Sequence, residues 1–136
     1  MRLWHKDLIS VLPDKQLLGQ WRECCCIARN IAVNGSPNHL LVNKIMDHSL
    51  NSFMVYCYHV QREMRKRGFK VNVHPTKYLH IPYPSVCKLS EIYNDWHNKR
   101  YLKQCFYNLQ EKYDCGGMTY DEYAKILNFV LEEGMI

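Results

Sequence analysis

The chain has 136 residues, of which 47% are hydrophobic and 23% are charged. This length fits one domain, and the composition is that of a globular protein rather than a disordered chain. Its apolar runs are too short to span a membrane, and the charged start at Met1–Asp7 does not match a secretory signal. We therefore expect a single soluble domain over residues 1–136, located in the cytoplasm.

The net charge of +5 lies entirely in the first half of the chain. Residues 1–68 carry ten basic and five acidic side chains, whereas residues 69–136 carry eight of each. A one-sided basic excess favours a polyanionic partner such as nucleic acid, although many ordinary soluble domains have a similar balance.

The helical periodicity of the apolar residues predicts an all-α fold. The first long helix is expected to begin near Pro13 and to end at Asn34-Gly35. Gly19 inside it costs about 1 kcal/mol relative to alanine, which indicates a close approach of another backbone. The apolar side of this helix is formed by Leu17, Trp21, Cys24 or Cys25, Ala28 and Ile31.

The remaining elements follow from cap and breaker residues. Ser36-Pro37 is predicted to open a short helix, and Ser49–Arg67 a long one that ends at Gly68. Residues 69–90 contain three prolines and are expected to form a long irregular loop. A helix is predicted over residues 95–114. The capping-box pattern of Thr119 and Glu122 opens the last one.

The seven cysteines include three consecutive ones, Cys24 to Cys26. Because adjacent helical residues point in different directions, this run cannot form a simple disulfide framework. The sequence contains no C-x-x-C or H-x-x-x-H pair and no nucleotide-binding motif. We therefore expect reduced thiols that serve as small core residues, with no metal and no cofactor.

Charged and polar residues recur along the first long helix. Lys15, Arg22 and Arg29 follow one another at seven-residue steps and form a basic stripe. Gln16, Gln20 and Glu23 share a neighbouring stripe. A carboxylate beside arginines can act in acid–base chemistry or stabilise charge. The commoner meaning of such a pattern is a solvated helix face.

The amino terminus is a second candidate group. An α-amine has an unperturbed pKa of about 7.7–8.0, compared with about 10.4 for lysine, so it is the better neutral nucleophile at physiological pH. If the amine of Met1 were packed near Glu23, it could attack an aldehyde-like sugar carbon and form a Schiff base. The alternative is a frayed terminus.

The densest basic cluster lies near residue 66. It suits phosphate contacts, although basic residues at a helix C-terminus also compensate the helix dipole. Tyrosines are frequent over residues 78–101, where they could stack on bases or pack in the core. The cluster consists of Arg62, Arg65, Lys66, Arg67 and Lys70.

Several segments carry a resemblance to a known family. They are Met1–His5, Leu8-Ile9, Leu12-Pro13, Gln16–Glu23, Glu63–Phe69, Trp96–Leu102 and Gln104–Tyr113. In these segments the chain resembles the pyrimidine-dimer DNA glycosylase family, which includes the bacteriophage endonuclease V. The resemblance is greatest to a bacterial branch of that family, over most of the chain. It implies an endonuclease V-like helical fold.

The resemblance also implies a chemistry. Family enzymes attack C1′ of a damaged nucleotide with the N-terminal α-amine, form an imine and nick the strand by β-elimination, with the nucleotide flipped out. The resemblance thus implies a monomeric DNA repair glycosylase with AP lyase activity on damaged double-stranded DNA. Glu23 matches the catalytic glutamate, Arg22 its neighbouring arginine, and Arg2 the arginine that follows the nucleophile. We expect Arg29, Arg62 and Lys66 to contact DNA as well.

The chain departs from the phage enzyme at its start. The phage enzyme exposes a threonine when its initiator methionine is removed, whereas the bulky Arg2 is expected to keep Met1 in place here. The nucleophile would then be the amine of Met1, one residue farther from Glu23. Two other functions stay open: a non-catalytic nucleic-acid-binding module on the same scaffold, and a structural or interaction protein.

Overall fold

The computed structural model describes residues 1–71, 75–81 and 88–134. Over these residues the chain is helical and has no strand, which confirms the predicted all-α class. None of the described helices is long and apolar enough to cross a membrane. The α-helices are α1 (Asp14–Asn34), α2 (Leu50–Lys66), α3 (Thr76–Leu79), α4 (Lys99–Asp114) and α5 (Tyr120–Glu132). The 3-10 helices are η1 (Lys6–Val11), η2 (Asn43–Asp47) and η3 (Leu89–Glu91).

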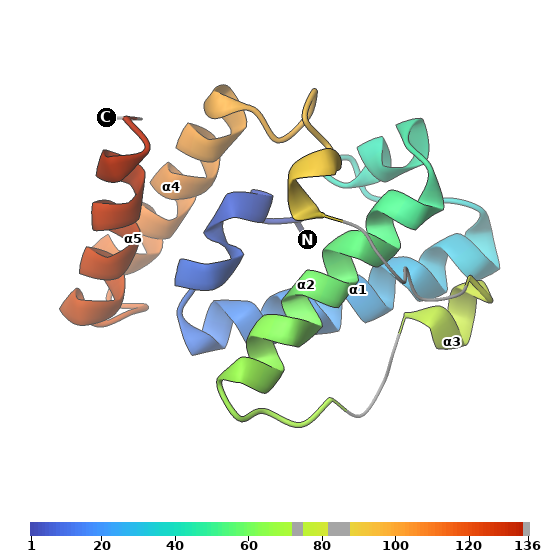
Figure 1. Cartoon of the computed structure of the whole chain (residues 1–136), viewed down its shortest axis with the longest axis horizontal. Coiled ribbons are helices and arrows are strands. Elements are labelled where there is room, and N and C mark those ends of the chain that lie inside the picture. The colour runs from blue at the N-terminus through green and yellow to red at the C-terminus, as the bar shows by residue number, and fades with distance from the viewer. Residues whose placement is uncertain (72–74, 82–87, 135–136) are drawn as a thin grey trace.

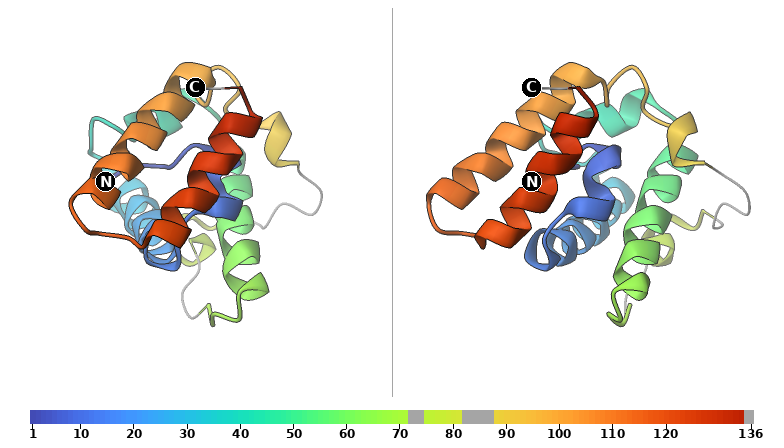
Figure 2. Two further views of the ribbon diagram at one scale, coloured as in Figure 1. Left: turned by 90° about the vertical axis from the view of Figure 1, so that its left-hand side faces the viewer. Right: turned by 60° about the vertical axis from the view of Figure 1, so that its left-hand side comes forward.

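The helices form two packed pairs with the start of the chain between them. α1 packs against α2, and α4 packs against α5, which follows it after a tight turn (Figure 1). η1 lies between the pairs and contacts both α2 and α5, as the turned views show (Figure 2). The first residues of the chain are therefore enclosed by helices from both halves of the sequence.

α1 follows the predicted apolar stripe. Cys24 faces the core and is fully buried, whereas Cys25 is half-buried. The helix ends at Gly35, whose φ of 78° is left-handed and whose N–H bonds to the carbonyl of Ile31. The backbone approach predicted at Gly19 is wrong, because a Cβ placed there would meet only the Arg22 guanidinium, at 3.8 Å.

Two predicted boundaries are wrong because local side-chain bonds replace helical ones. The segment from Ser36 to Val42 is a loop, and only η2 turns helically after it. The helix predicted from residue 95 begins instead at Lys99, since the Asn98 side chain accepts the N–H of Tyr101 at 2.9 Å and caps the helix there.

The other predicted boundaries agree with the structure. Ser49 caps α2, and the capping box of Thr119 and Glu122 opens α5. In the predicted loop over residues 69–90, the described part contains the short helix α3 and the start of η3. Residues 72–74 and 82–87 lie outside the described residues.

The cysteines are core residues only in part. Cys24, Cys57 and Cys105 are buried free thiols, as predicted. Burial, reinforced by the neighbouring thiols, raises the pKa of Cys25 to about 12, so this thiol stays protonated at neutral pH. Cys26 and Cys115 are exposed. Cys87 lies outside the described residues.

Two buried histidines join the start of the chain to the turn before α4. The ring of His5 donates from Nε2 to the carbonyl of His97 at 2.9 Å, and Nδ1 of His97 accepts the N–H of Lys6 at 2.9 Å. These bonds fit neutral rings. Burial lowers the pKa of His5, and burial together with the neighbouring His5 and Lys6 lowers the pKa of His97 to about 2.

The depressed pKa of His97 predicts loss of stability in acid. The pKa of His97 in the unfolded chain is 6.5. Below that pH the unfolded chain binds a proton at His97, whereas the folded chain does not. The stabilisation is complete above pH 6.5 and falls as the pH drops, by about 1.4 kcal/mol per pH unit. Urea unfolding at several pH values between 7.5 and 4.5 measures this slope.

The control for this experiment is His97→Asn, which keeps an acceptor for the N–H of Lys6 but does not titrate. Carboxylates and histidines that do not interact with His97 titrate alike in both proteins, so they cancel in the comparison. The free energy of unfolding of the wild type should fall more steeply with acid than that of the variant. Parallel slopes would show that His97 titrates normally in the folded protein.

Candidate active site at the amino terminus

The first residues of the chain form no helix, and Leu3, Trp4 and His5 are buried. Trp4 is 7% exposed and His5 is 2% exposed, whereas Met1 is 37% exposed, so the segment behind the terminal residue is packed into the molecule. Residues 1–5 belong to no helix or strand, and their backbone groups therefore need partners from elsewhere in the molecule.

Gln20 of α1 holds this segment from one side. Its Nε2 donates to the carbonyl of Arg2 at 2.9 Å, and its Oε1 accepts the N–H of Trp4 at 2.7 Å. Gln20 is 1% exposed, so these bonds form away from water. One side chain thus satisfies backbone groups on both sides of Leu3 and sets the path of the chain along α1.

Two tyrosines complete the arrangement from other helices. The hydroxyl of Tyr56 on α2 donates to the carbonyl of Trp4 at 2.6 Å and also contacts Oε1 of Gln20 at 3.0 Å. The hydroxyl of Tyr101 on α4 donates to the carbonyl of Leu3 at 2.5 Å. We call Gln20, Tyr56 and Tyr101 the N-terminal clamp. It fixes the segment against three helices.

The clamp places the amino terminus beside Glu23. The N–H of Arg2 donates to Oε2 of Glu23 at 3.2 Å, and the α-amino nitrogen of Met1 lies 4.0 Å from Oε1. Glu23 follows Gln20 by one helical turn, so one face of α1 carries both Gln20 of the clamp and the carboxylate. The structure therefore brings together three of the predicted site residues, Met1, Arg2 and Glu23.

The side chain of Arg2 lines one of two adjoining hollows. Its guanidinium lies 5.5 Å from the Trp4 ring centroid, in cation–π range. One hollow, of about 280 Å³, is lined by Arg2, Leu41, Tyr101, Gln104 and Asn108. The second, of about 330 Å³, shares Leu41, Tyr101 and Gln104 and is further lined by Leu40, Lys44, Trp96, Asn98 and Arg100. We call the two together the N-terminal groove.

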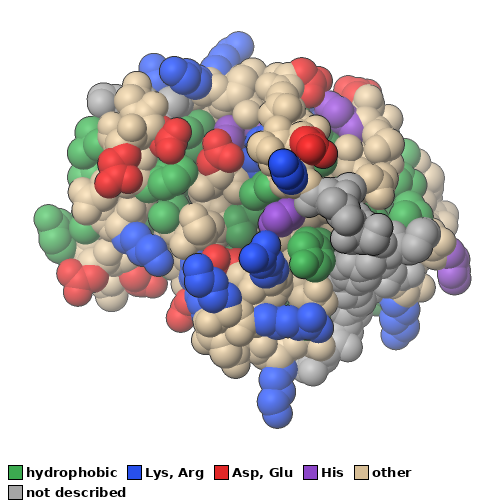
Figure 3. Space-filling model, in the orientation of Figure 1, with side chains coloured by type: hydrophobic (Ala, Val, Ile, Leu, Met, Phe, Trp, Pro, Cys, Tyr) green, Lys and Arg blue, Asp and Glu red, His purple; other side chains and the backbone are tan. Residues whose placement is uncertain are grey.

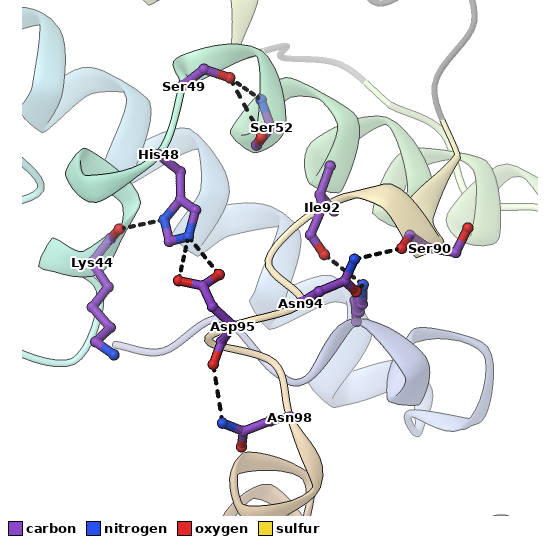
Figure 4. A network of polar contacts seen from close by, with 10 residues as sticks. Lys44, His48, Ser49, Ser52, Ser90, Ile92, Asn94, Asp95 and Asn98 are labelled. Atoms are coloured by element: carbon purple, nitrogen blue, oxygen red, sulfur yellow. Dashed lines mark hydrogen bonds and ion pairs between the residues drawn. The ribbon is translucent and has the colours of Figure 1, made fainter.

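An ion pair joins the two sides of this groove. Nε2 of His48, just after η2, lies 2.9 Å from Oδ1 of Asp95 in the turn before α4 (Figure 4). His48 also bonds through Nδ1 to the carbonyl of Lys44 at 3.0 Å. Burial alone would lower the pKa of His48, but the bonds to Asp95 and Lys44 outweigh it and raise that pKa. The pair is therefore strongest when His48 is protonated.

The predicted arginines of α1 lie outside the N-terminal groove. Arg22 is exposed next to Glu23 and lines a hollow of about 450 Å³ with Trp21 and Tyr78 among others. Arg29 lies two turns farther along and lines a separate hollow of about 260 Å³. Both are free to meet a ligand on the outer face of α1, at increasing distance along the helix from Glu23.

The predicted DNA contacts on α2 lie in a different place. Arg62 and Lys66 line a hollow of about 590 Å³, together with Lys6 and Phe129 among others. Basic side chains gather over the C-terminal end of α2 in the space-filling view (Figure 3). The structure does not bring these two residues to the amino terminus.

Arg67 has a structural role that the sequence hypothesis overlooked. Its Nε bonds to Glu63 at 2.8 Å, and its Nη1 bonds to Asp14 at 3.0 Å and to the carbonyl of Leu12 at 2.6 Å. These contacts join the end of α2 to the start of α1. Arg67 therefore does not belong with the exposed basic residues of the cluster predicted around residue 66.

The clamp predicts the effect of replacing Gln20. Gln20→Ala leaves the carbonyl of Arg2 and the N–H of Trp4 without their hydrogen-bond partner. It also removes one contact of the Tyr56 hydroxyl. We expect a loss of about 2–4 kcal/mol in the free energy of unfolding. Gln16→Ala, one turn earlier on the same helix, should cost about 0.5 kcal/mol or less. Urea unfolding compares the two, and equal losses would contradict a special role of Gln20.

Comparison with known proteins identifies a family for the first part of the chain. Residues 1–76, more than half of the chain, match the family model for pyrimidine dimer DNA glycosylase. The matched stretch includes the amino terminus, Gln20 and Glu23. Searches of curated proteins and of solved structures returned no match. With its amino terminus clamped beside Glu23 and this match over all of its first four elements, the chain belongs to the pyrimidine dimer DNA glycosylase family.

Proposed function

We propose that this member of the DNA repair glycosylases has AP lyase activity as well, and that it works through an imine on its own amino terminus. The observation that carries the proposal is the α-amine of Met1, 4.0 Å from Oε1 of Glu23 at the end of a clamped segment. An amine held in this way has few orientations, which is what a nucleophile needs before it meets its substrate.

The chemical steps follow from the two groups. The neutral amine attacks C1′ of the damaged nucleotide, and the bond from C1′ to the base breaks as the base leaves with the electron pair. Loss of the amine proton and opening of the sugar ring give the imine. A base then removes a proton from C2′, and the bond from C3′ to its phosphate oxygen breaks. Glu23 is the carboxylate near enough to the amine to move these protons.

The cations near Glu23 supply the contacts to DNA in this proposal. Arg22 directly precedes Glu23 in the chain, and the backbone N–H of Arg2 bonds to the Glu23 carboxylate, so both arginines would hold phosphates next to the reacting sugar. Arg29 extends this contact along α1, and Arg62 and Lys66 form a second basic area on α2. Binding to duplex DNA should therefore weaken steeply with salt.

Replacing Glu23 tests the proposal. Glu23→Gln keeps the size of the side chain and removes its charge and its basicity. We expect single-turnover nicking of an abasic duplex to slow by a factor of about 10² or more, because general acid–base groups contribute on that scale. Affinity for the same duplex should change little. Glu111→Gln, on the exposed face of α4, is the matched control and should nick at the wild-type rate.

The same assay separates the alternatives. Full activity of Glu23→Gln would remove this carboxylate from the mechanism. A wild-type protein that binds damaged duplex in a salt-dependent way but gives no product from ultraviolet-irradiated or abasic DNA would be a binding module. A protein without salt-dependent affinity for DNA would be neither the proposed enzyme nor a nucleic-acid-binding module.

A further inference from the structure

Two leucines beside the N-terminal groove face solvent. Leu40 is 86% exposed and Leu41 is 48% exposed, at the tip of the loop between α1 and η2. A single exposed leucine is ordinary on a protein surface. Two adjacent ones, on a loop next to a candidate active site, call for a physical reason.

The loop holds these leucines in fixed positions. Oδ1 of Asn43 accepts the N–H of His39 at 3.0 Å, and the carbonyl of His39 accepts the N–H groups of Val42 at 3.1 Å and Asn43 at 2.9 Å. At the base of the loop, Val42 and Ile45 are fully buried. The turn is therefore held in place on its inner side, and Leu40 is presented almost fully, and Leu41 about half, to solvent.

Three cations line the groove together with the leucines. Leu41 lines one hollow with Arg2, and both leucines line the adjoining hollow with Lys44 and Arg100. Among the described residues that line these two hollows, none is acidic. An apolar tip within a basic surround suits a polyanion whose interior is apolar, and a base-paired duplex has that character.

We propose that Leu40 and Leu41 form a wedge that enters the base stack next to the damaged nucleotide, while Lys44 and Arg100 contact the flanking phosphates. The wedge rests on the proposed function, because Arg2 connects the groove to Glu23 and the amine. Unstacking one base step costs a few kcal/mol, and an apolar side chain that fills the gap offsets this cost. Leu40 and Leu41 would thus stabilise the opened duplex in which C1′ is accessible.

A second copy of the chain fits this surface less well. A stable interface between two proteins buries about 1,200–2,000 Å², far more than two leucine side chains provide. In a twofold contact the same patch meets itself, so Lys44 and Arg100 would face their own copies. Like charges at close range oppose such a contact.

The test compares a double variant, Leu40→Ala with Leu41→Ala, to the single variant Leu131→Ala. Leu131 lies on α5 and is 48% exposed, the same as Leu41, so it controls for the loss of an exposed leucine. Two readouts are used. One is single-turnover nicking of an abasic site in a duplex and in a single strand. The other is the fluorescence of 2-aminopurine placed beside an uncleavable abasic analogue in a duplex, which rises when the base unstacks.

The wedge predicts a selective loss. The double variant should nick the duplex at least about tenfold more slowly than the wild type, nick the single strand within about twofold of it, and lose the fluorescence rise. Leu131→Ala should match the wild type in every readout. Since all three leucines are exposed, thermal unfolding should show the variants folded, and the single variant Leu40→Ser serves if the double variant is not.

Other outcomes overturn the wedge or the chemistry separately. A double variant that nicks both substrates at the wild-type rate and keeps the fluorescence rise would overturn the wedge and leave the proposed function standing. A wild-type protein that nicks neither substrate would overturn the proposed function, and its fluorescence rise, present or absent, would then decide the wedge. A dimer in sedimentation that the double variant abolishes would assign the leucines to self-association and overturn the wedge.

Discussion

An extended chain segment inside a protein has no helix or sheet to satisfy its own N–H and C=O groups, and residues 2–4 form such a segment. Here the partners are side chains from three helices: Gln20, Tyr56 and Tyr101. An unmet buried backbone group costs about 1–3 kcal/mol, so displacing this segment is expensive. The position of the amino terminus is therefore set by the core of the molecule and not by a surface loop.

This constraint explains how a chain terminus, usually the most mobile part of a protein, can serve as a site. Gln20 and Glu23 lie one turn apart on α1, so the side chain that fixes the backbone and the carboxylate that faces the amine share one rigid element. The buried pair of His5 and His97 continues the attachment as far as the turn before α4. Because that turn also carries Trp96 and Asn98 of the groove, the amine and the groove are positioned together.

The sequence predicted well what depends on periodicity and short-range capping. The apolar stripe of α1 and the capping box at Thr119 follow local rules, and both agree with the structure. The boundaries predicted at Ser36 and at residue 95 failed because single side chains, Asn43 and Asn98, bond to nearby backbone and end the helical pattern. The misassigned segment is the one that presents Leu40 and Leu41 to solvent.

The candidate site was predictable only in part. The resemblance pointed to Met1, Arg2 and Glu23, and the structure brings these together. The stripe placed Gln20 on the same face as Glu23 but said nothing of its bonds. Tyr56 and Tyr101 act over separations of 52 and 98 residues, which no local pattern reveals. Charge density likewise did not show that Arg67 is held by Glu63 and Asp14.

The measurement that tests the account most directly is borohydride trapping on an abasic duplex, followed by peptide mapping of the covalent adduct. Mass spectrometry of the untreated protein first establishes that the chain begins at Met1 with a free amine. The account predicts one adduct, on the α-nitrogen of Met1, beside Glu23. An adduct on a lysine such as Lys6, or no adduct while the duplex is nicked, would contradict it.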